Sequence, residues 1–373
     1  MKKPEARRFG QLAIAVVLGA IGLGNPARAD DDSHGERGLR HVLLISIDGM
    51  HAIDLQRWIK GHPKGTLAEL AERGTTYSQA FTTAPSDSFP GMLAQVTGGT
   101  PLSAGVFYDD SYDRTLYAPA SNCVGTAGAE TQFAENLDYN LNDVTGGGTL
   151  GKPLSQINPQ NLPMRKAGDG ACVVVYPHEF IRVNTIFEVL RGHGLHTAWS
   201  DKHPAYDILN GPSGTGIEDL FTPEINSQLP GAPAGSDNTT SFAGTRNYDS
   251  IKVKAVINQI NKKNSTGVVV GYVPAIFGMN FQAVSVGQKL AKAGFGDDPS
   301  LIGGYSDAAG TPGNGLTLQL AFVEDSIRQM VEALKANHIY DRTAIIVSAK
   351  HGVADRPHPA TRDPRYLQHG VAE

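Results

Sequence analysis

His41-Val-Leu-Leu-Ile-Ser-Ile-Asp-Gly49 is the stretch of sequence that decides the fold. Its first seven residues are almost continuously apolar, which is typical of a strand buried on both faces of a parallel sheet. The run ends abruptly at Asp48-Gly49, so that a carboxylate directly follows the predicted strand. Because ligands bind at the carboxyl ends of the strands in open α/β sheets, Asp48 is a candidate site residue.

Helix and strand patterns alternate along the rest of the chain. Helices are predicted at residues 66–74, 184–191, 249–260 and 320–334, and strands at 195–200, 267–272 and 343–348. Alternation of this kind predicts an α/β fold, with a doubly wound, mostly parallel sheet that carries helices on both faces.

The chain of 373 residues is long enough for one large α/β domain with insertions. The expected organisation is a signal peptide at 1–29, a linker at 30–40, a catalytic core at 41–352 and a short atypical tail at 353–373. Within the core, segments 108–177 and 210–247 are rich in Gly, Pro, Asn and Ser and lack periodicity. They are predicted to be loop insertions that form a substrate-facing rim.

The N-terminus has the features of a secretory signal peptide. A basic start at Lys2-Lys3 precedes a short apolar run and the small-residue cleavage site Ala27-Arg28-Ala29. Removing residues 1–29, which carry five basic residues and one acid, changes the net charge from −5 to −9. We therefore expect an acidic exported protein, periplasmic or secreted, with no membrane span and no nucleic-acid-binding surface.

Cys123 and Cys172 are the only cysteines. In an oxidising compartment the default expectation is a disulfide between them, although two free thiols or a metal pair remain alternatives. The bond would close a loop of about 50 residues and stabilise the fold by roughly 4 kcal/mol in the chain-entropy model.

Pro85-Ser-Asp-Ser-Phe-Pro-Gly91 places a serine hydroxyl, Ser88, at a predicted helix start. Ser88 could be a simple N-cap, but the helix N-terminus also suits an anion. Two further predicted strands end in polar residues, the first in Asp201 and the second in Lys350-His351. Residues that leave separate strands at one sheet edge are expected to form a site together with Ser88.

These segments belong to a wider set of motifs with a family likeness. The set comprises Ile45-Ser-Ile-Asp-Gly49, Ser88-Phe-Pro90, Val96-Thr-Gly98, Gly105-Val-Phe-Tyr-Asp-Asp-Ser-Tyr-Asp113, Asp325 and Ser348-Ala-Lys-His-Gly352. From about residue 41 to 352 the chain resembles the type I phosphodiesterase/nucleotide pyrophosphatase branch of the alkaline phosphatase superfamily. The resemblance implies an alkaline phosphatase-like fold and metal-dependent hydrolysis of a small phosphate ester.

The resemblance also implies roles for particular residues. Members of the family use a Ser or Thr nucleophile flanked by two divalent metal ions, usually zinc. Ser88 matches the nucleophile, and Asp48, Ser88 and His351 match the ligands of one ion. A metal would lower the pKa of the serine hydroxyl and neutralise the phosphoryl oxygens.

The chain departs from the family pattern at several positions. Lys350 stands where the family has an Asp, and Ala275 and Met279 stand where ligands of the second ion are expected. Asp109 replaces an Asn that helps to hold the phosphoryl oxygen, and the family continues well beyond Gly352. A non-catalytic, anion-binding descendant of the fold and an inactive truncated fragment therefore remain alternative interpretations.

Three of the candidate residues keep two interpretations. Lys350 could pair with Asp48 or bind a phosphoryl oxygen, or it could be a surface lysine. Asp201 and His203 could orient the substrate or replace a metal site, or they could cap a turn. The sequence does not decide between these roles.

Overall fold

The computed structural model describes residues 38–132 and 136–352. The predicted signal peptide at 1–29, residues 30–37 of the predicted linker and the predicted tail at 353–373 lie outside the described residues. Within the described part, no helix is long and apolar enough to cross a membrane.

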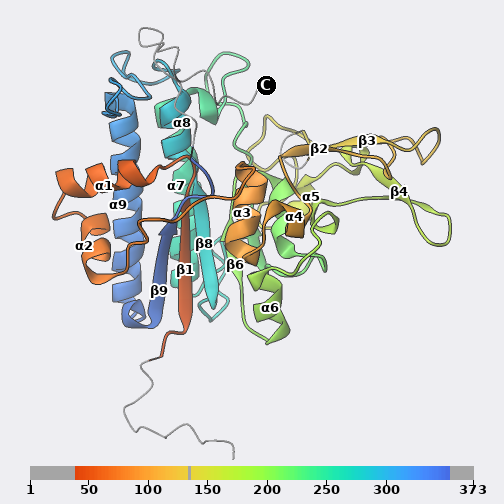
Figure 1. Ribbon diagram of the computed structural model, residues 1–373, viewed down its shortest axis with the longest axis horizontal. Coiled ribbons are helices and arrows are strands. Elements are labelled where there is room, and N and C mark those ends of the chain that lie inside the picture. The colour runs from red at the N-terminus through yellow and green to blue at the C-terminus, as the bar shows by residue number, and fades with distance from the viewer. Residues whose placement is uncertain (1–37, 133–135, 353–373) are drawn as a thin grey trace, which may run out of the picture. The chain divides into compact units, whose positions relative to one another are not determined.

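A five-stranded parallel sheet forms the centre of the described chain (Figure 1). Its strands, in spatial order, are β7 (Asp219–Phe221), β6 (Ala198–Ser200), β8 (Ile276–Phe281), β1 (His41–Ile47) and β9 (Thr343–Ser348). The predicted strands at 41–47, 195–200 and 343–348 are thus confirmed, with β6 shorter than expected. All pairings within this sheet are parallel.

Helices cover both faces of the sheet, as the alternating pattern predicted. The first face packs against α1 (Ala52–Gly61), α2 (Thr66–Arg73), α7 (Phe242–Ile260), α8 (Ala283–Lys289) and α9 (Asn314–Ala336). The second face packs against α3 (Ser88–Thr97), α4 (Pro101–Ala104), α6 (Ile186–Gly192) and the 3₁₀ segment η3 (Pro204–Asn210). Consecutive residues of β1 alternate between the two cores, since Leu43 and Ile45 join the first and Leu44 joins the second.

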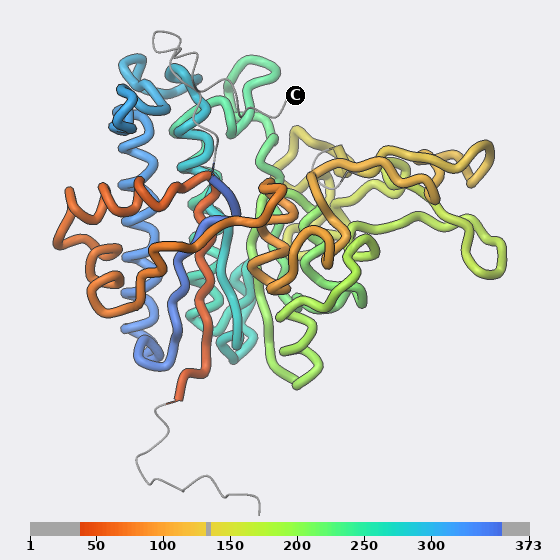
Figure 2. Tube along the Cα trace, viewed as in Figure 1, coloured from red at the N-terminus to blue at the C-terminus, as the bar shows by residue number. Residues whose placement is uncertain are grey.

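The predicted insertion at 108–177 contains regular structure of its own (Figure 2). Two antiparallel pairs lie in it, β2 (Asp110–Asp113) with β3 (Ala129–Gln132) and β4 (Met164–Lys166) with β5 (Cys172–Val174). Short helical turns complete it, namely α5 (Pro153–Gln156), η1 (Pro159–Asn161) and η2 (Pro177–Glu179).

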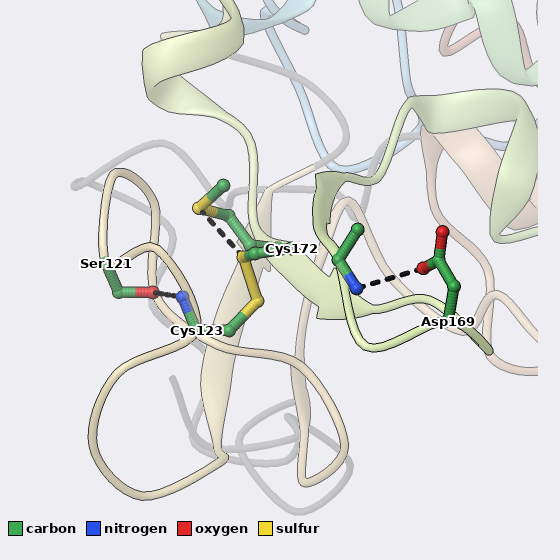
Figure 3. Close-up of a disulfide and its surroundings, with 6 residues drawn as sticks. Ser121, Cys123, Asp169 and Cys172 are labelled. Atoms are coloured by element: carbon green, nitrogen blue, oxygen red, sulfur yellow. Dashed lines mark hydrogen bonds between the residues drawn. A yellow bond between two sulfur atoms is a disulfide. The ribbon is translucent and has the colours of Figure 1, made fainter.

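The predicted disulfide is confirmed. Cys123, in the β2–β3 connection, is bonded to Cys172 at the start of β5, with a Cα–Cα distance of 5.8 Å (Figure 3). The bond joins residues 49 apart in the sequence and thereby ties the two antiparallel pairs to each other.

The strand predicted at 267–272 is wrong, because the central strand is β8, which begins at Ile276, four residues after the predicted strand ends. Gly267 and Gly271 adopt left-handed backbone angles that a strand does not accommodate. Val268 and Val269 are 62% and 74% exposed, whereas every residue of β8 is buried. The apolar run was therefore a surface loop, and the true strand carries less β-branched character.

Two boundaries around the second predicted insertion also differ. Segment 210–247 contains β7, whose three residues are too few for a periodic pattern to reveal, and the turn η4 (Asn238–Thr240). Helix α7 begins at Phe242 rather than at Asp249, because Ser241 and the carboxylate of Asp297 accept the first free N–H groups. The turn η5 (Tyr340–Arg342) leads into β9.

Candidate active site

Ser88 is the first residue of α3 rather than its N-cap. The N-cap is Asp87, whose backbone is extended and whose carboxylate accepts the Ser88 N–H at 2.7 Å. This arrangement excludes the alternative of a simple serine N-cap and leaves the Ser88 hydroxyl without a capping role. It also places a carboxylate, rather than an open set of N–H groups, at the start of the helix.

The ends of β1 and β9 meet the start of α3. Ser88 Oγ lies 3.2 Å from His351 Nε2, and the same nitrogen lies 3.1 Å from Asp48 Oδ1. Lys350 Nζ lies 3.1 Å from the other carboxylate oxygen, Asp48 Oδ2. Four of the residues predicted from the sequence therefore converge at the carboxyl end of the sheet.

Gly91 allows α3 to approach this strand end closely. A Cβ at this position would overlap the carbonyl oxygen of Lys350. Because glycine has no Cβ, the helix packs directly on the backbone of the residue that precedes His351. The main chain thus fixes the separation between Ser88 and the end of β9.

The charges around Asp48 keep it ionised. Burial favours the neutral acid, but Lys350 and His351 outweigh that effect and hold the pKa of Asp48 well below its usual value. Burial lowers the pKa of Lys350, while Asp48 opposes the change. The two side chains are 2% and 1% exposed, so that each is the main compensation for the buried charge of the other.

The end of β8 supplies another contact to Asp48. Gln282 Nε2 donates to Asp48 Oδ2 at 2.7 Å. The backbone at this point is held by Asp249, which accepts the N–H groups of Gln282 and Ala283 at 2.8 Å each and pairs with Lys252. A buried ion pair in α7 thus fixes the position of Gln282, and through it the orientation of Asp48.

The tautomer of His351 follows from its hydrogen bonds. Nδ1 lies 2.8 Å from the carbonyl oxygen of Gly352, which can only accept, so Nδ1 carries a proton. Nε2 faces both Ser88 Oγ and Asp48 Oδ1. Asp48 Oδ1 is buried and has no hydrogen-bond partner among the described residues. A positive charge between Nε2 and Asp48 Oδ1, carried by a ring proton or by a bound cation, satisfies both atoms.

These three donors fit one metal ion. Carboxylate oxygen, imidazole nitrogen and serine oxygen are ligands that zinc accepts. The ion would be held by Asp48, Ser88 and His351, which is the set that the resemblance implied. Lys350 and Gln282 occupy the opposite carboxylate oxygen and leave Oδ1 for this purpose.

The same surroundings do not fit a second metal ion. Met279 is fully buried inside β8, and Ala275 precedes that strand, so neither offers a ligand. Across residues 38–132 and 136–352, no three His, Cys, Asp or Glu side chains converge in a way that could hold a metal. A site built from two such side chains and a serine is the most that the described residues provide.

Asp109 lies beside Asp87 rather than beside Asp48. Its backbone N–H donates to Asp87 Oδ2 at 3.2 Å. Burial and the charge of Asp87 raise the pKa of Asp109 to about 6. Asp109 is therefore a second carboxyl group near the start of α3, beside Asp87, the residue that precedes Ser88.

Asp201 and His203 are held by other protein groups. Asp201 accepts from the Trp199 indole at 3.0 Å and from Asn280 at 3.1 Å, and it is fully buried. His203 is 1% exposed and lies 2.9 Å from Glu224. β8 separates β6 from β1, so Asp201 is one strand removed from Asp48. A substrate-binding role for Asp201 and His203 stays a prediction.

Two residues of the site were not found from the sequence. Gln282 directly follows a strand, but that signal was hidden because the strand had been predicted at 267–272. Tyr206 lies in η3, where no pattern in the sequence points toward β9, yet its hydroxyl accepts from Lys350 Nζ at 2.8 Å. Only the three-dimensional arrangement brings it to the site.

Comparison with known proteins identifies a family to which the chain is similar. The family model described as type I phosphodiesterase/nucleotide pyrophosphatase matches residues 42–363. No curated protein sequence matches the chain. Among solved structures, the chain is similar to phosphonoacetate hydrolase from Sinorhizobium meliloti 1021, in complexes with phosphonoacetate and with phosphonoformate. Both comparisons have 17% identity and a TM-score of 0.42, and both cover 84% of this chain. The chain spans 57% of the length of that enzyme.

Proposed function

Because the chain belongs to the type I phosphodiesterase/nucleotide pyrophosphatase family, we propose that it is an exported phosphoric-ester hydrolase with Ser88 as its nucleophile. The observation that carries the proposal is the position of the Ser88 hydroxyl. It lies at the start of α3, 3.2 Å from His351 Nε2, which in turn lies 3.1 Å from Asp48 Oδ1. A hydroxyl so placed faces an imidazole and a carboxylate at the sheet edge where ligands bind.

The proposed reaction has two steps. Ser88 Oγ loses its proton to solvent and forms a bond to phosphorus, while the bond from phosphorus to the alcohol breaks and the alcohol takes up a proton from solvent. Water then attacks the phosphoseryl intermediate, the Oγ–P bond breaks, and Ser88 regains its proton. A small phosphate ester, whether a diester, pyrophosphate or monoester, can follow this course.

Asp48, Ser88 and His351 would hold one divalent metal ion, for which zinc is the proposed identity. Such an ion lowers the pKa of a serine hydroxyl and neutralises phosphoryl oxygens. Lys350 and Gln282 hold the remaining oxygen of Asp48 and so orient its carboxylate. Lys350 also contributes a fixed positive charge at a position where the family has an Asp.

A non-catalytic, anion-binding protein is the second candidate. It is favoured by the lack, among residues 38–132 and 136–352, of any cluster of three metal-ligating His, Cys, Asp or Glu side chains. Metal content separates the two candidates. After dialysis against zinc, we expect about one tightly bound ion per chain for the hydrolase, measured by elemental analysis, and none for the anion-binding protein.

Export rests on the predicted signal peptide at 1–29 and on the disulfide between Cys123 and Cys172, which suits an oxidising compartment. We propose a periplasmic or secreted location. Cell fractionation tests it: the mature protein should appear outside the cytoplasm without residues 1–29, and a full-length cytoplasmic protein would contradict the proposal.

The nucleophile is tested by replacing it. Ser88→Ala should lower the hydrolysis of 4-nitrophenyl phosphate esters by about 10³-fold or more, with zinc present, because the attacking oxygen is removed. Ser86→Ala is the matched control, since Ser86 is an exposed serine two residues away whose hydroxyl bonds to Thr82. Equal rates in wild type and Ser88→Ala would exclude Ser88 as the nucleophile.

A further inference from the structure

We propose that Gln288, oriented by Tyr305, is a positioning residue that holds the ends of β1 and β9 at the separation that the proposed metal site needs. Gln288 lies in α8 and belongs to none of the motifs described above. It acts on Gly49, which directly follows the proposed ligand Asp48. The inference deepens the proposed function and rests on the proposed metal ion.

Gly49 links the two strand ends. The regular pairing of β1 with β9 ends at Ser46 and Ser348. Beyond it, the backbone N–H of Gly49 donates to the carbonyl oxygen of His351 at 3.1 Å. A rotation of the Gly49 peptide would therefore change the distance of 3.1 Å between Asp48 Oδ1 and His351 Nε2. Because a metal site needs its ligand atoms within a few tenths of an ångström of their places, this peptide has to be held.

Gln288 fixes the carbonyl group of Gly49. Gly49 has a φ of 78°, a left-handed conformation that turns the chain out of β1. Its carbonyl oxygen lies 2.9 Å from Gln288 Nε2. A carbonyl oxygen only accepts, so the atom of Gln288 that faces it must be the amide nitrogen. The N–H and the C=O of Gly49 are thus both engaged, the first by the segment after β9 and the second by α8.

Gln288 is itself held by a tyrosine and a carboxylate. Its Nε2 donates to the Tyr305 hydroxyl at 2.9 Å, and that hydroxyl donates to Asp54 Oδ2 at 2.8 Å. Nε2 carries two hydrogens, so one serves Gly49 and the other faces Tyr305 and, at 3.4 Å, Asp54 Oδ2. Asp54 is 1% exposed, and a hydrogen bond to a buried carboxylate is stronger than one between neutral groups. The carboxylate therefore orients the tyrosine, and the tyrosine orients the amide.

The same network returns to the strand ends through His51. Asp54, in the first turn of α1, accepts the backbone N–H of His51 at 3.2 Å, and His51 Nδ1 lies 3.1 Å from the same oxygen. The imidazole lies against Gly352, where an added Cβ would stand 2.8 Å from His51 Cδ2. Gly352 follows His351 and forms an isolated parallel bridge with Gly49. These contacts form a closed ring that touches the chain directly beyond both metal ligands.

The test compares Gln288→Met with Gln319→Met. Methionine is similar to glutamine in length and helix propensity but offers no N–H group. Gln319 is a fully buried residue of α9 whose Nε2 donates to the carbonyl oxygen of Phe242 at 3.1 Å. Its replacement removes the same kind of hydrogen bond elsewhere in the fold. Urea unfolding identifies conditions in which both variants are fully folded.

The first measurement is amide hydrogen exchange of the metal-free protein, read by mass spectrometry on the peptide that contains Gly49. In Gln288→Met the Gly49 amide should exchange about 10-fold faster than in wild type, because one hydrogen bond no longer holds its peptide group. Exchange in the middle of β1, and Gly49 exchange in Gln319→Met, should stay within about twofold of wild type. This pattern separates a local release of the strand end from a general loss of stability.

The second measurement is zinc affinity, titrated against a chelator of known affinity. The Kd should rise about 10-fold in Gln288→Met, as is typical when a group that orients metal ligands is lost. It should change by less than about twofold in Gln319→Met. Tyr305→Phe keeps the ring and removes the hydroxyl that orients Gln288, so it should raise the Kd as well. Combining it with Gln288→Met should add little to the larger single effect.

The outcomes distinguish the positioning role from the proposed function. Equal Gly49 exchange in the two glutamine variants would overturn the inference. Faster exchange with an unchanged zinc Kd would overturn it as well, because the strand ends would then not set the ligand positions. Additive effects of Gln288→Met and Tyr305→Phe would contradict the orienting role of Tyr305. A wild-type protein that binds no zinc would instead reject the proposed metal site, and the positioning role would fall with it.

Discussion

Asp48 and Asp138 are both buried carboxyl groups, yet their surroundings shift their pKa values in opposite directions. Asp48 lies at the end of β1 between Lys350 and His351, and these partners hold its pKa well below the usual value against the effect of burial. Asp138 lies in the insertion against Glu224. Burial, followed by the charge and hydrogen bond of Glu224, raises its pKa to about 8.

Both regions contain buried acids and a histidine, but they differ in the groups that face the carboxylate. Near Asp138 the imidazole of His203 is already engaged, since it lies 2.9 Å from both oxygens of Glu224. A protonated Asp138 can donate to Glu224, so this region stores a proton. At Asp48 the partners are Lys350 and His351 rather than a second acid, and one carboxylate oxygen has no hydrogen-bond partner among the described residues. The comparison shows that charge balance, rather than the presence of acids and histidines, marks the chemical site.

The largest expected effect is to make Asp48 resemble Asp138 by removing Lys350. Lys350→Met leaves a buried carboxylate without its ammonium partner and should cost about 3–5 kcal/mol of stability at neutral pH. In wild type, the contribution of Asp48 is fully present above its unfolded pKa of 3.8 and is lost as the pH falls through the lower folded value. In the variant burial raises the pKa of Asp48, so the deficit relative to wild type should be largest at neutral pH and should shrink as the pH falls and Asp48 is protonated. Urea unfolding between pH 3 and 8 measures both effects.

Lys60→Met is the control for this variant. Lys60 is an exposed lysine in the last turn of α1, and its replacement should change stability by less than about 0.5 kcal/mol. If the Lys350→Met protein were as stable as the control, with an unchanged acid limb of the pH profile, Lys350 would not be what keeps Asp48 ionised.

A second, pH-dependent effect is expected when Asp138 is replaced by a neutral residue. The stability that Asp138 contributes is complete below its unfolded pKa of 3.8 and declines as the pH rises toward its folded value of about 8. Asp138→Asn does not titrate, so the variant should gain on wild type across this window, by at most about 1.4 kcal/mol per pH unit. Denaturant unfolding at several pH values gives the slope directly.

Asp143→Asn serves as the comparison in the same insertion. Asp143 is a less buried carboxylate that accepts the Thr145 N–H at 2.9 Å. Its replacement shows what the loss of a carboxylate in this insertion does to stability away from Glu224. A pH-independent difference for Asp138→Asn would contradict the stored proton.

The smallest effect concerns Asp109, which is only half-buried and lies between the two extremes. Its pKa of about 6 means that it gains a negative charge near Ser88 as the pH rises from 5 to 7. Binding of an anionic ester should weaken over this range, so KM should rise by a few-fold in wild type. Asp109→Asn should flatten that rise, and an identical pH dependence of KM in both proteins would exclude the effect.

Local patterns predicted the parts of the fold in which local and tertiary forces agree. β1 is an apolar run that is buried from Leu43 onward, and α9 has an apolar face at helical spacing, so burial reinforces propensity in both. β9 is an apolar run at the edge of the sheet, and most of its residues are only half-buried. The apolar run at 267–272 was misassigned because its valines are exposed between two glycines. α7 starts early because Ser241 caps it and because Asp297, which is distant in the sequence, accepts two further N–H groups at its start.

The site was predictable to the extent that strand ends determine it. Asp48 and His351 follow β1 and β9, and Ser88 begins a helix, so simple positional rules bring the three together. Gln282 and Tyr206 were missed for different physical reasons. Gln282 depended on the true end of β8, and Tyr206 reaches Lys350 from η3 through a contact that only the folded chain creates.

The central claim is that Ser88 forms the covalent intermediate, and its most direct test is to trap that intermediate. The zinc-loaded protein is mixed with a 4-nitrophenyl phosphate ester, quenched in acid, digested and analysed by mass spectrometry. We predict a phosphoryl adduct on the peptide that contains Ser88, and its loss in Ser88→Ala. An adduct on a different residue, or full turnover by Ser88→Ala, would contradict the account.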